Sequence, residues 1–268
     1  MNGSWSGRDR RRLGSFQWVL ALLFGLIALS LAAGGYWFNR YEAQVIRKEK
    51  YIELEAIAEL KAGQIAAWRR ERLADARLNS TTLFFRSILH QWLESPDDIA
   101  LKASILDRLK LLRDSEGYEN IFLAGLDGRL LLTLDPDLTY FEAHTKDLIA
   151  QAVSSREAVF GNIYRCQTHH LIHLDLAAPV LGEADRPLAV LVLRSDPERY
   201  LFPLIQSWPT PSRSAETMLA RKDGDSILFL NRLRHRPDPP LTLRIPLSQA
   251  DLPAARAALG ETGEVEGR

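Results

Sequence analysis

An uninterrupted apolar segment near the amino terminus constrains the fold of this chain more than any other feature. Residues 16–38 contain no charged side chain, and as a helix they are long enough to cross a hydrocarbon layer of about 30 Å. We therefore predict a transmembrane helix at residues 16–38. A cleaved signal peptide is the alternative, but the apolar region of such a peptide spans only about 7 to 15 residues.

The residues on either side of this segment predict its orientation. Residues 1–15 carry four arginines and one aspartate, and aromatic side chains stand at both ends of the segment as Trp18, Tyr36 and Trp37. Positively charged flanks stay on the cytoplasmic side, and Trp and Tyr mark the interfaces. We expect residues 1–15 to be a cytoplasmic basic tail at the inner membrane of a bacterium, and the residues after about 39 to be extracytoplasmic. A twin-arginine export signal is the other interpretation of the paired arginines, but the residues after them do not support it.

The overall composition excludes some classes of function. The formal net charge is +0 and 46% of the residues are hydrophobic. The chain can therefore bury a core, but it lacks the basic surface of a protein that binds nucleic acid. Its single cysteine, Cys166, cannot form a disulfide within the chain and is expected to be a small buried residue.

The segment after the membrane helix predicts one very long helix. Residues 40–94 have no proline and one glycine, and we expect a break near Asn79. Apolar residues repeat along this segment at a spacing of eleven, close to three helical turns, so they fall on one stripe. They are Leu54, Ile57, Ile65 and Trp68. We interpret the stripe as the seam of a homodimer, and we expect the charged residues around it, including Lys61, to face water or a partner.

Residues 95–199 have the pattern of a module that mixes helices and strands. The sequence SPDD predicts a helix N-terminus with Ser95 as its cap, followed by a helix at about 97–114. YENIFLAGLDGRLLLTL has two apolar runs around the Asp-Gly pair at Asp127, which is the signal of a β-hairpin. A helix near 144–154 and three strands, FGNIYR, HHLIHLDLAAPV and PLAVLVLRSDP, complete this module.

A second hairpin repeats the first one. Residues 121–134 align without a gap on residues 217–230, and the two stretches share their Asp-Gly pair and several leucines. Residues 200–214 read as a proline-rich connector, and residues 215–268 as a second module. We expect this second module to be incomplete, because it has too few strands to complete a sheet. The predicted fold class is α+β, with a transmembrane helix, a long extracytoplasmic helix and two modules with antiparallel sheets.

Two stretches carry a resemblance to a known family, KAGQIAAWRRERLADARLNS and YLFPLIQSWPTPSRSAETMLARKDGDSILFLNRLRH. With the order of the elements, they resemble the extracytoplasmic double Cache, or tandem PAS-like, sensor regions of bacterial transmembrane histidine kinases and diguanylate cyclases with PAS domains. The resemblance covers nearly the whole chain. It implies signal transduction, in which the membrane-distal module binds a small ligand and the long helix transmits a shift across the membrane to an output domain.

The same resemblance sets expectations about activity. These 268 residues carry no kinase or cyclase signature, so we expect no catalytic residues and no enzyme activity in this chain, and an output domain would belong to sequence outside it. The alternative is a membrane-anchored structural or protein-interaction module without signalling output. A hydrolase built on Ser214 is the weakest hypothesis, because this serine has no GxSxG context.

The strand HHLIHLDLAAPV provides the candidate ligand site. Because side chains alternate along a strand, His169, His173 and Asp175 would share one face. The preceding strand adds Tyr164 and Arg165. We predict that Tyr164, Arg165, His173 and Asp175 contact a small polar or anionic ligand. A solvent-exposed polar face without a ligand is the alternative.

No metal and no cofactor are expected. His169, His173 and Asp175 stand at i, i+4 and i+6, which matches no common metal-ligand spacing. The Asp-Gly pairs at Asp127 and Asp223 lack the series of oxygen ligands that a calcium loop needs. The tyrosine, arginine and tryptophan motif of the amino-acid-binding members of the family is not visible, so the identity of the ligand stays open.

Overall fold

The computed structural model describes residues 7–210, 212–236, 238–249, 251–263 and 265, with side chains from residue 18 onward. The chain divides into two units, residues 1–56 and residues 57–268. The side chains of the predicted basic tail at 1–15 lie outside the described part.

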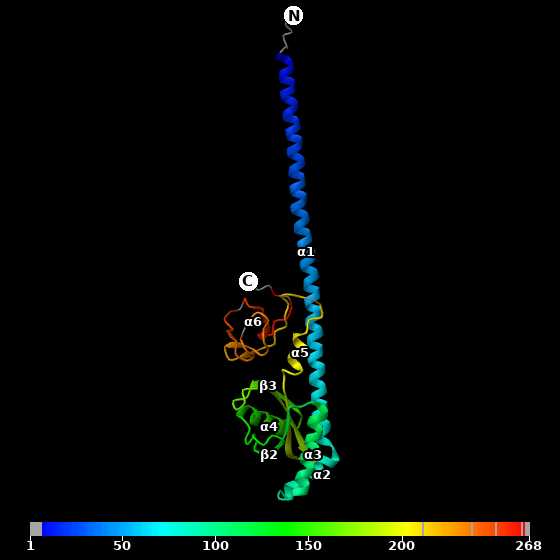
Figure 1. Cartoon of the computed structure of the whole chain (residues 1–268), viewed down its shortest axis with the longest axis vertical. Helices are drawn as coiled ribbons and strands as arrows, with labels where there is room; N and C mark the ends of the chain where they lie inside the picture. Colours follow the sequence, from blue (N-terminus) through cyan, green and yellow to red (C-terminus); the bar gives the residue numbers. More distant parts are fainter. Residues whose placement is uncertain (1–6, 211, 237, 250, 264, 266–268) are drawn as a thin grey trace. The chain divides into compact units, whose positions relative to one another are not determined.

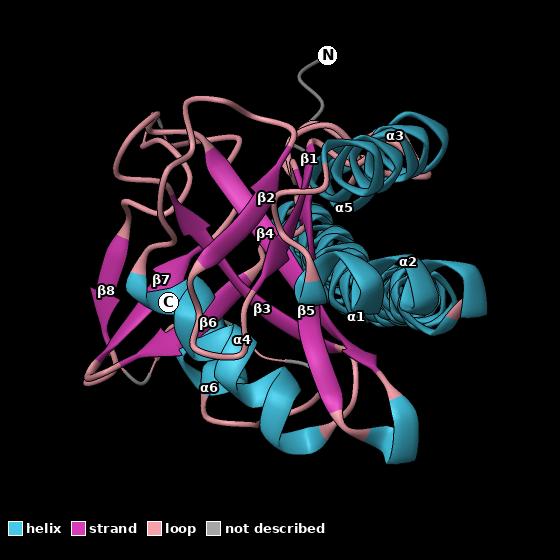
Figure 2. Ribbon diagram, turned by 90° about the horizontal axis from the view of Figure 1, so that it is seen from below, coloured by secondary structure: helices cyan, strands magenta, loops and turns pink. Residues whose placement is uncertain are grey.

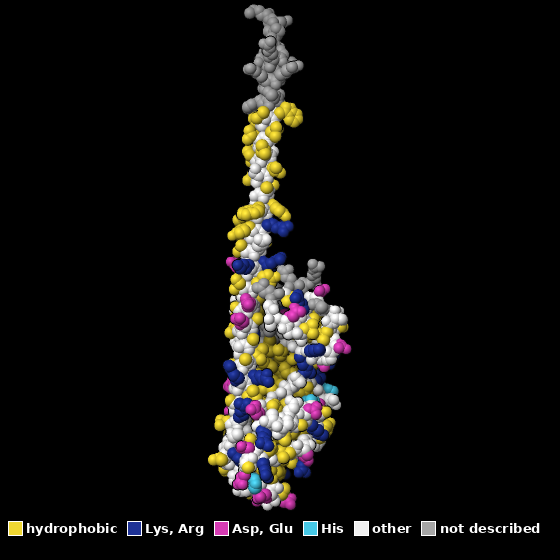
Figure 3. Space-filling view, turned by 180° about the vertical axis from the view of Figure 1, so that it is seen from behind, with side chains coloured by type: hydrophobic (Ala, Val, Ile, Leu, Met, Phe, Trp, Pro, Cys, Tyr) yellow, Lys and Arg dark blue, Asp and Glu magenta, His cyan; other side chains and the backbone are white. Residues whose placement is uncertain are grey.

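The first unit contains the greater part of helix α1 (Gly7–Thr81), which is 75 residues long (Figure 1). Large apolar side chains such as Leu22, Phe24 and Leu29 are exposed along it, and Figure 3 shows hydrophobic side chains on the stretch of the helix between the grey atoms and the first Lys and Arg side chains. Within the described residues, α1 is the one helix long and apolar enough to cross a membrane, with a mean hydropathy of 2.1 in its most apolar window. A helix suits such a sequence because its backbone groups are bonded within the segment.

In the second unit, α1 is followed by α2 (Leu83–Glu94) and α3 (Ile99–Glu116). The predicted helix at 40–94 is thus interrupted at Thr82, where the backbone leaves the helical conformation with φ −58° and ψ 124°. The Thr82 hydroxyl donates to the Leu78 carbonyl at 2.9 Å. Such bonds from threonine to the preceding turn compete with regular helix, which explains why the break falls close to Asn79.

A five-stranded antiparallel sheet forms the core of the second unit, with the strand order β2-β1-β5-β4-β3 (Figure 2). Its strands are β1 (Asn120–Ala124), β2 (Leu130–Thr133), β3 (Val159–Arg165), β4 (Ile172–Leu181) and β5 (Pro187–Ser195). A short 3-10 helix, η1 (Glu183–Asp185), joins β4 to β5. The neighbouring strands β4 and β5 are apolar along almost their whole length, because both faces of the sheet are covered.

Alternation along the strands divides the core into two layers. On one face, Leu191 of β5 belongs to a cluster with Leu89 of α2 and Ile105 of α3. On the other face, Val190 of β5 belongs to a cluster with Ile149 of helix α4 (Ala143–Ser155). Neighbouring residues of one strand therefore pack into opposite layers of the core.

A second, smaller sheet follows the connector helix α5 (Leu201–Gln206). It is antiparallel, with the order β6-β7-β8, and its elements are β6 (Ala220–Asp223), β7 (Ser226–Phe229), β8 (Arg244–Pro246) and α6 (Pro253–Ala258). Ile227, Phe229 and Ala255 are buried in its own cluster. The fold is therefore α+β, with a long helix and two antiparallel sheets. After α6, the described residues 261–263 and 265 form no strand.

The two hairpins share their second strand but differ in their turns. The gapless alignment places β2 on β7, since residues 130–133 correspond to residues 226–229. The first turn has five residues, and Gly125 N donates to the Arg129 carbonyl across it at 2.9 Å. In the second hairpin, Asp223 pairs directly with Ser226, which leaves a two-residue turn. Both turns use a glycine with positive φ, at 78° for Gly128 and 61° for Gly224.

The N-cap of α3 differs from the prediction. Asp98, and not Ser95, is the cap, and its Oδ1 accepts hydrogen bonds from Ala100 N at 2.9 Å and Leu101 N at 3.0 Å. Ser95 instead ends α2, where its N–H bonds to carbonyls of the last turn. The helix starts later than predicted because the residues after Ser95 form a turn, in which the Pro96 carbonyl accepts from Trp92 Nε1 at 3.1 Å.

Replacing Asp98 with alanine should lower the free energy of unfolding by about 1 kcal/mol, because two N–H groups at the start of α3 lose their acceptor. The measurement is urea unfolding of the full chain in detergent, followed by circular dichroism. Asp97→Ala is the matched control, since this neighbouring carboxylate is not the cap, and it should change stability by less than about 0.5 kcal/mol. Equal effects of the two changes would contradict the assignment of the cap.

Candidate ligand-binding site

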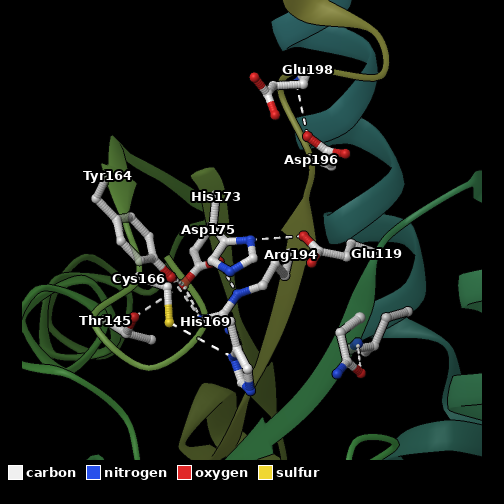
Figure 4. A network of polar contacts seen from close by, with 12 residues as sticks. Glu119, Thr145, Tyr164, Cys166, His169, His173, Asp175, Arg194, Asp196 and Glu198 are labelled. Carbon is white, nitrogen blue, oxygen red and sulfur yellow. Dashed lines mark hydrogen bonds and ion pairs between the residues drawn. The ribbon is translucent and has the colours of Figure 1, made fainter. Parts of the chain in front are cut away.

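A buried ion pair between the neighbouring strands β4 and β5 is the centre of the site. Asp175 on β4 lies directly opposite Arg194 on β5, and it is 1% exposed. Arg194 donates from Nε to Asp175 Oδ1 at 2.9 Å and from Nη2 to Oδ2 at 3.0 Å (Figure 4). The guanidinium and the carboxylate therefore meet as a fork, which is the strongest geometry for this pair.

Two hydroxyl groups from other elements complete the pairing of Asp175. Tyr164 on β3 donates to Asp175 Oδ2 at 2.7 Å, and Thr145 on α4 donates to the same oxygen at 3.0 Å. Arg194 Nη2 also donates to the Tyr164 hydroxyl at 2.7 Å, and the guanidinium lies over the Phe122 ring with 4.7 Å to its centroid. The charged groups are buried but have several partners, as buried charges require.

The ionisation of these groups follows from their surroundings. Burial alone would raise the pKa of Asp175, but the charge of Arg194 and the three donor side chains outweigh it, so that this pKa lies below its ordinary value. Burial would lower the pKa of Arg194, but the charge and hydrogen bonds of Asp175 raise it. The pKa of Tyr164 is raised by burial and by the neighbouring carboxylate. At neutral pH the site thus holds an ionised pair and a neutral phenol.

Two histidines flank the Tyr164 ring. His173 is 2% exposed, and its Nδ1 lies 2.7 Å from Oε2 of Glu119, the residue that precedes β1. The ring of His144 on α4 is 3.5 Å from the Tyr164 ring, centroid to centroid. Burial lowers the pKa of His144, so this imidazole is neutral at pH 7. Its Nε2 is buried and has no hydrogen-bond partner among the described residues.

A cavity of about 290 Å³ opens beside this network, between α4 and strand β3, and we call it the α4 cavity. Tyr164 and Asp175 form part of its wall, and its other polar lining residues are His144, Asp147, Gln151, Asn162 and Arg221. Gly161 also lines it, and a Cβ at this position would lie 3.1 Å from the Asp175 carbonyl oxygen and 3.1 Å from Leu148 Cδ2. The glycine therefore lets β3 come close to β4 and α4.

Three of the four predicted ligand residues come together in the structure. Tyr164, His173 and Asp175 lie within one polar network. Arg165 lies outside it, because alternation turns its side chain away from that of Tyr164. Its guanidinium donates to the His170 carbonyl at 2.7 Å and to the Pro240 carbonyl at 2.8 Å.

The predicted strand face is shorter than expected. Strand β4 begins at Ile172, so His169 does not continue the face of His173 and Asp175. The residues before it form a tight turn, in which Cys166 N donates to the Leu171 carbonyl at 2.8 Å and His170 has a positive φ of 58°. Cys166 itself is buried. Within the described part of the chain, no group of three or more potential ligand side chains could hold a metal ion.

The sequence reasoning missed Arg194, Thr145 and Arg221. Arg194 had a visible signal, since it is the one charged residue inside the apolar run PLAVLVLRS. A charge in a strand covered on both faces needs a buried counter-ion, and Asp175 is in the corresponding position of the other long strand. Thr145 and Arg221 carry no such signal, because their part depends on how α4 and β6 pack.

The stripe predicted as a dimer seam is partly buried within the chain. Leu54 belongs to the first unit and is half exposed, whereas Ile57 and Trp68 are buried, and Ile65 packs beside Trp68. The Trp68 ring lies against Phe160 of the same chain, with 5.7 Å between the centroids. The Trp68 side chain is therefore covered by the chain itself, whereas Leu54 stays half exposed, and the homodimer seam stays a prediction.

Lys61 is also placed differently from the expectation that it faces water. It is 5% exposed, and its Nζ donates to the Leu204 carbonyl at 2.6 Å and to Ser207 Oγ at 2.8 Å. Arg72 and Asp75, which stand at i and i+3 on the same helix, form an ion pair at 3.7 Å.

Comparison with solved structures returns sensory domains. The chain is similar to the ligand-binding domain of the Campylobacter jejuni chemoreceptor Tlp3 in complex with L-valine, at 14% identity and a TM-score of 0.45, over 57% of this chain and 62% of that domain. It is similar to the V. cholerae histidine kinase DctB sensor domain, at 15% identity and a TM-score of 0.49, over 62% of this chain and 61% of that one. It is also similar to the ligand-binding domain of the Pseudomonas fluorescens chemoreceptor CtaA in complex with L-serine, at 13% identity and a TM-score of 0.47, over 76% of this chain and 79% of that domain.

The resemblance seen in the sequence is thus found again in these structures. The chain spans about 60% of the length of the Tlp3 domains that it matches. No family model matches the sequence, and no curated protein matches it either.

Replacing Asp175 with asparagine should lower the free energy of unfolding by about 3–5 kcal/mol, because Arg194 is left buried without a counter-ion. The double variant Asp175→Leu/Arg194→Met should lose less than this, since it removes both charges together. Asp147→Asn is the control, an exposed carboxylate at the same cavity. Chemical unfolding of the full chain measures all three. A loss below about 1 kcal/mol for Asp175→Asn would contradict the structural role of the pair.

The same pair predicts how stability depends on pH. The pKa of Asp175 is lower in the folded state than its ordinary value of 3.8. Its contribution is therefore fully present above pH 3.8 and is lost as the pH falls through the folded-state pKa. Urea midpoints measured between about pH 6 and pH 2.5 should fall more steeply for the wild-type chain than for Asp175→Asn. Parallel curves would show that Asp175 does not contribute to acid unfolding.

Proposed function

We propose that this chain is the sensory input region of a bacterial membrane signal-transduction protein, and that a small extracytoplasmic molecule binds in the α4 cavity. The observation that carries the proposal is the buried network of Asp175, Arg194 and Tyr164 in the wall of that cavity. A rigid charged wall beside an open cavity provides polar groups whose positions are set before the ligand arrives.

The lining of the α4 cavity supports a small polar ligand with groups of both charges. Arg221 is a cation, Asp147 an anion, and Gln151 and Asn162 each offer an amide donor and acceptor. The unpartnered Nε2 of His144 adds a group that can either donate or accept. The volume of about 290 Å³ is at the lower end for small-molecule sites, so the ligand is a small one.

The proposal includes a route from the cavity to the rest of the chain. Arg221 belongs to β6 in the second sheet, and its Nη1 donates to the Ile163 carbonyl of β3 at 3.0 Å. A ligand that recruits this guanidinium changes a contact between the two sheets. Ligand binding can shift the protein only through different affinities for two arrangements, and the position of Arg221 provides such a difference.

The membrane part of the proposal rests on α1. The helix carries the apolar segment and continues into the second unit, where Trp68 and Lys61 attach it to other elements. In the proposed protein, residues after about 39 are extracytoplasmic, the N-terminus is cytoplasmic, and the shift is received by an output domain absent from this chain. The catalytic activity, if the output is a kinase or cyclase, belongs to that domain.

A thermal-shift screen of small polar metabolites on the full chain in lipid nanodiscs tests the proposal. We expect at least one compound to raise Tm, and we expect Arg221→Ala to reduce that shift because the cavity loses its cation. Lys222→Ala is the matched control, since it removes the next cation on β6, which is exposed and does not line the cavity. A screen without any stabilising compound, or a shift that Arg221→Ala leaves unchanged, would argue against ligand binding at this site.

A further inference from the structure

A second cavity lies on the opposite face of the five-stranded sheet, and we call it the α1 cavity. Its volume is about 240 Å³, and its walls come from α1, from the end of α3 and from the connection between β5 and α5. It shares no lining residue with the α4 cavity. Leu174 lines the α1 cavity and Asp175 lines the α4 cavity. These residues are adjacent in β4, so their side chains point to opposite faces of the sheet.

One wall of the α1 cavity is aromatic and apolar. The rings of Trp68 and Tyr200 are stacked, with 6.3 Å between their centroids and 24° between their planes. Leu174 and Leu201 are buried and complete this wall. A flat apolar group that enters here would lie against aromatic faces, which favour offset stacking.

The other wall carries two arginines. Arg72 donates from Nη1 to the Glu116 carbonyl at 3.0 Å, and its guanidinium lies 5.3 Å from the centroid of the Tyr118 ring. Its Nε is buried and has no hydrogen-bond partner among the described residues. Arg199 is exposed, and no side-chain hydrogen bond or ion pair of it is present in the described part of the chain. A guanidinium group matches a carboxylate in charge and geometry, and the exposed one of Arg199 is accessible to it.

Acidic residues at the rim limit the charge of a ligand. Glu116 and Asp196 also line the cavity, and one oxygen of Asp196 already accepts from Glu198 N at 2.8 Å. Asp75 lies 3.7 Å from Arg72 as well. Three carboxylates thus lie near two guanidinium groups, so a ligand with the two or three negative charges of a phosphate would be repelled, and the charge of a ligand here is limited to one.

We propose that the α1 cavity binds a small aromatic monocarboxylate, with its ring against Trp68 and Tyr200 and its carboxylate between Arg72 and Arg199. The volume lies below the about 300 Å³ where sites for larger ligands begin, which restricts the ligand to roughly a single ring. Such a molecule bridges α1 and the connection that leads to α5. The site stands on its own residues and does not depend on a ligand in the α4 cavity.

A titration of the full chain in nanodiscs with 4-fluorobenzoate, followed by ¹⁹F NMR, tests this proposal. Saturable binding above that of empty nanodiscs is expected, with displacement by benzoate and none by uncharged benzamide. Arg199→Ala should weaken binding by about tenfold, because the carboxylate loses one of its two partners. This side chain is exposed, so the variant keeps its fold. Arg186→Ala, at another exposed arginine, should leave the affinity unchanged.

The outcomes separate this site from the α4 cavity. Affinity that falls in Arg199→Ala and persists in Arg221→Ala supports the α1 cavity. Affinity that falls only in Arg221→Ala overturns the α1 proposal and places the probe in the α4 cavity. The absence of saturable binding, or equal displacement by benzamide and benzoate, also overturns it, and neither result bears on the metabolite screen of the α4 cavity.

Discussion

The buried pair of Asp175 and Arg194 is the interaction on which the rest of the folded unit depends. Two charges removed from water are costly, and they are tolerated only when their geometry and hydrogen bonds are nearly complete. Here the completing groups come from separate elements, with Tyr164 on β3 and Thr145 on α4. The pair therefore links three strands and a helix, and a shift of β4 by one residue would turn Asp175 to the apolar layer formed by α2 and α3.

Much of this fold is predictable from sequence patterns, and the exceptions have physical reasons. The apolar segment at 16–38, helix α4 and the long strands follow from composition and periodicity. The motif SPDD predicts Ser95 as the cap, but the turn that holds Trp92 delays the helix to Asp98. In the same way, nearness in sequence predicts Arg165 in the site, whereas the side that it faces depends on alternation from Tyr164.

Sequence patterns predict only part of the site, for a related reason. Tyr164, His173 and Asp175 lie on adjacent strands, so alternation and a hairpin bring them together without further information. Arg194 comes from the strand on the other side of β4, and that neighbour is known only once the order β2-β1-β5-β4-β3 is known. Pairing between strands distant in sequence is a property of the whole sheet, and a local pattern does not contain it.

Lys61 restricts the motions that helix α1 can make. Its ammonium group holds the Leu204 carbonyl and Ser207 Oγ at the end of α5, and burial lowers its pKa. A turn of α1 about its axis by one residue position, about 100°, would swing this group away from both acceptors. A displacement of α1 along its axis would break them as well if α5 stayed in place. The two bonds thus couple α5 to this part of α1, so that a motion of the helix that keeps them moves α5 with it.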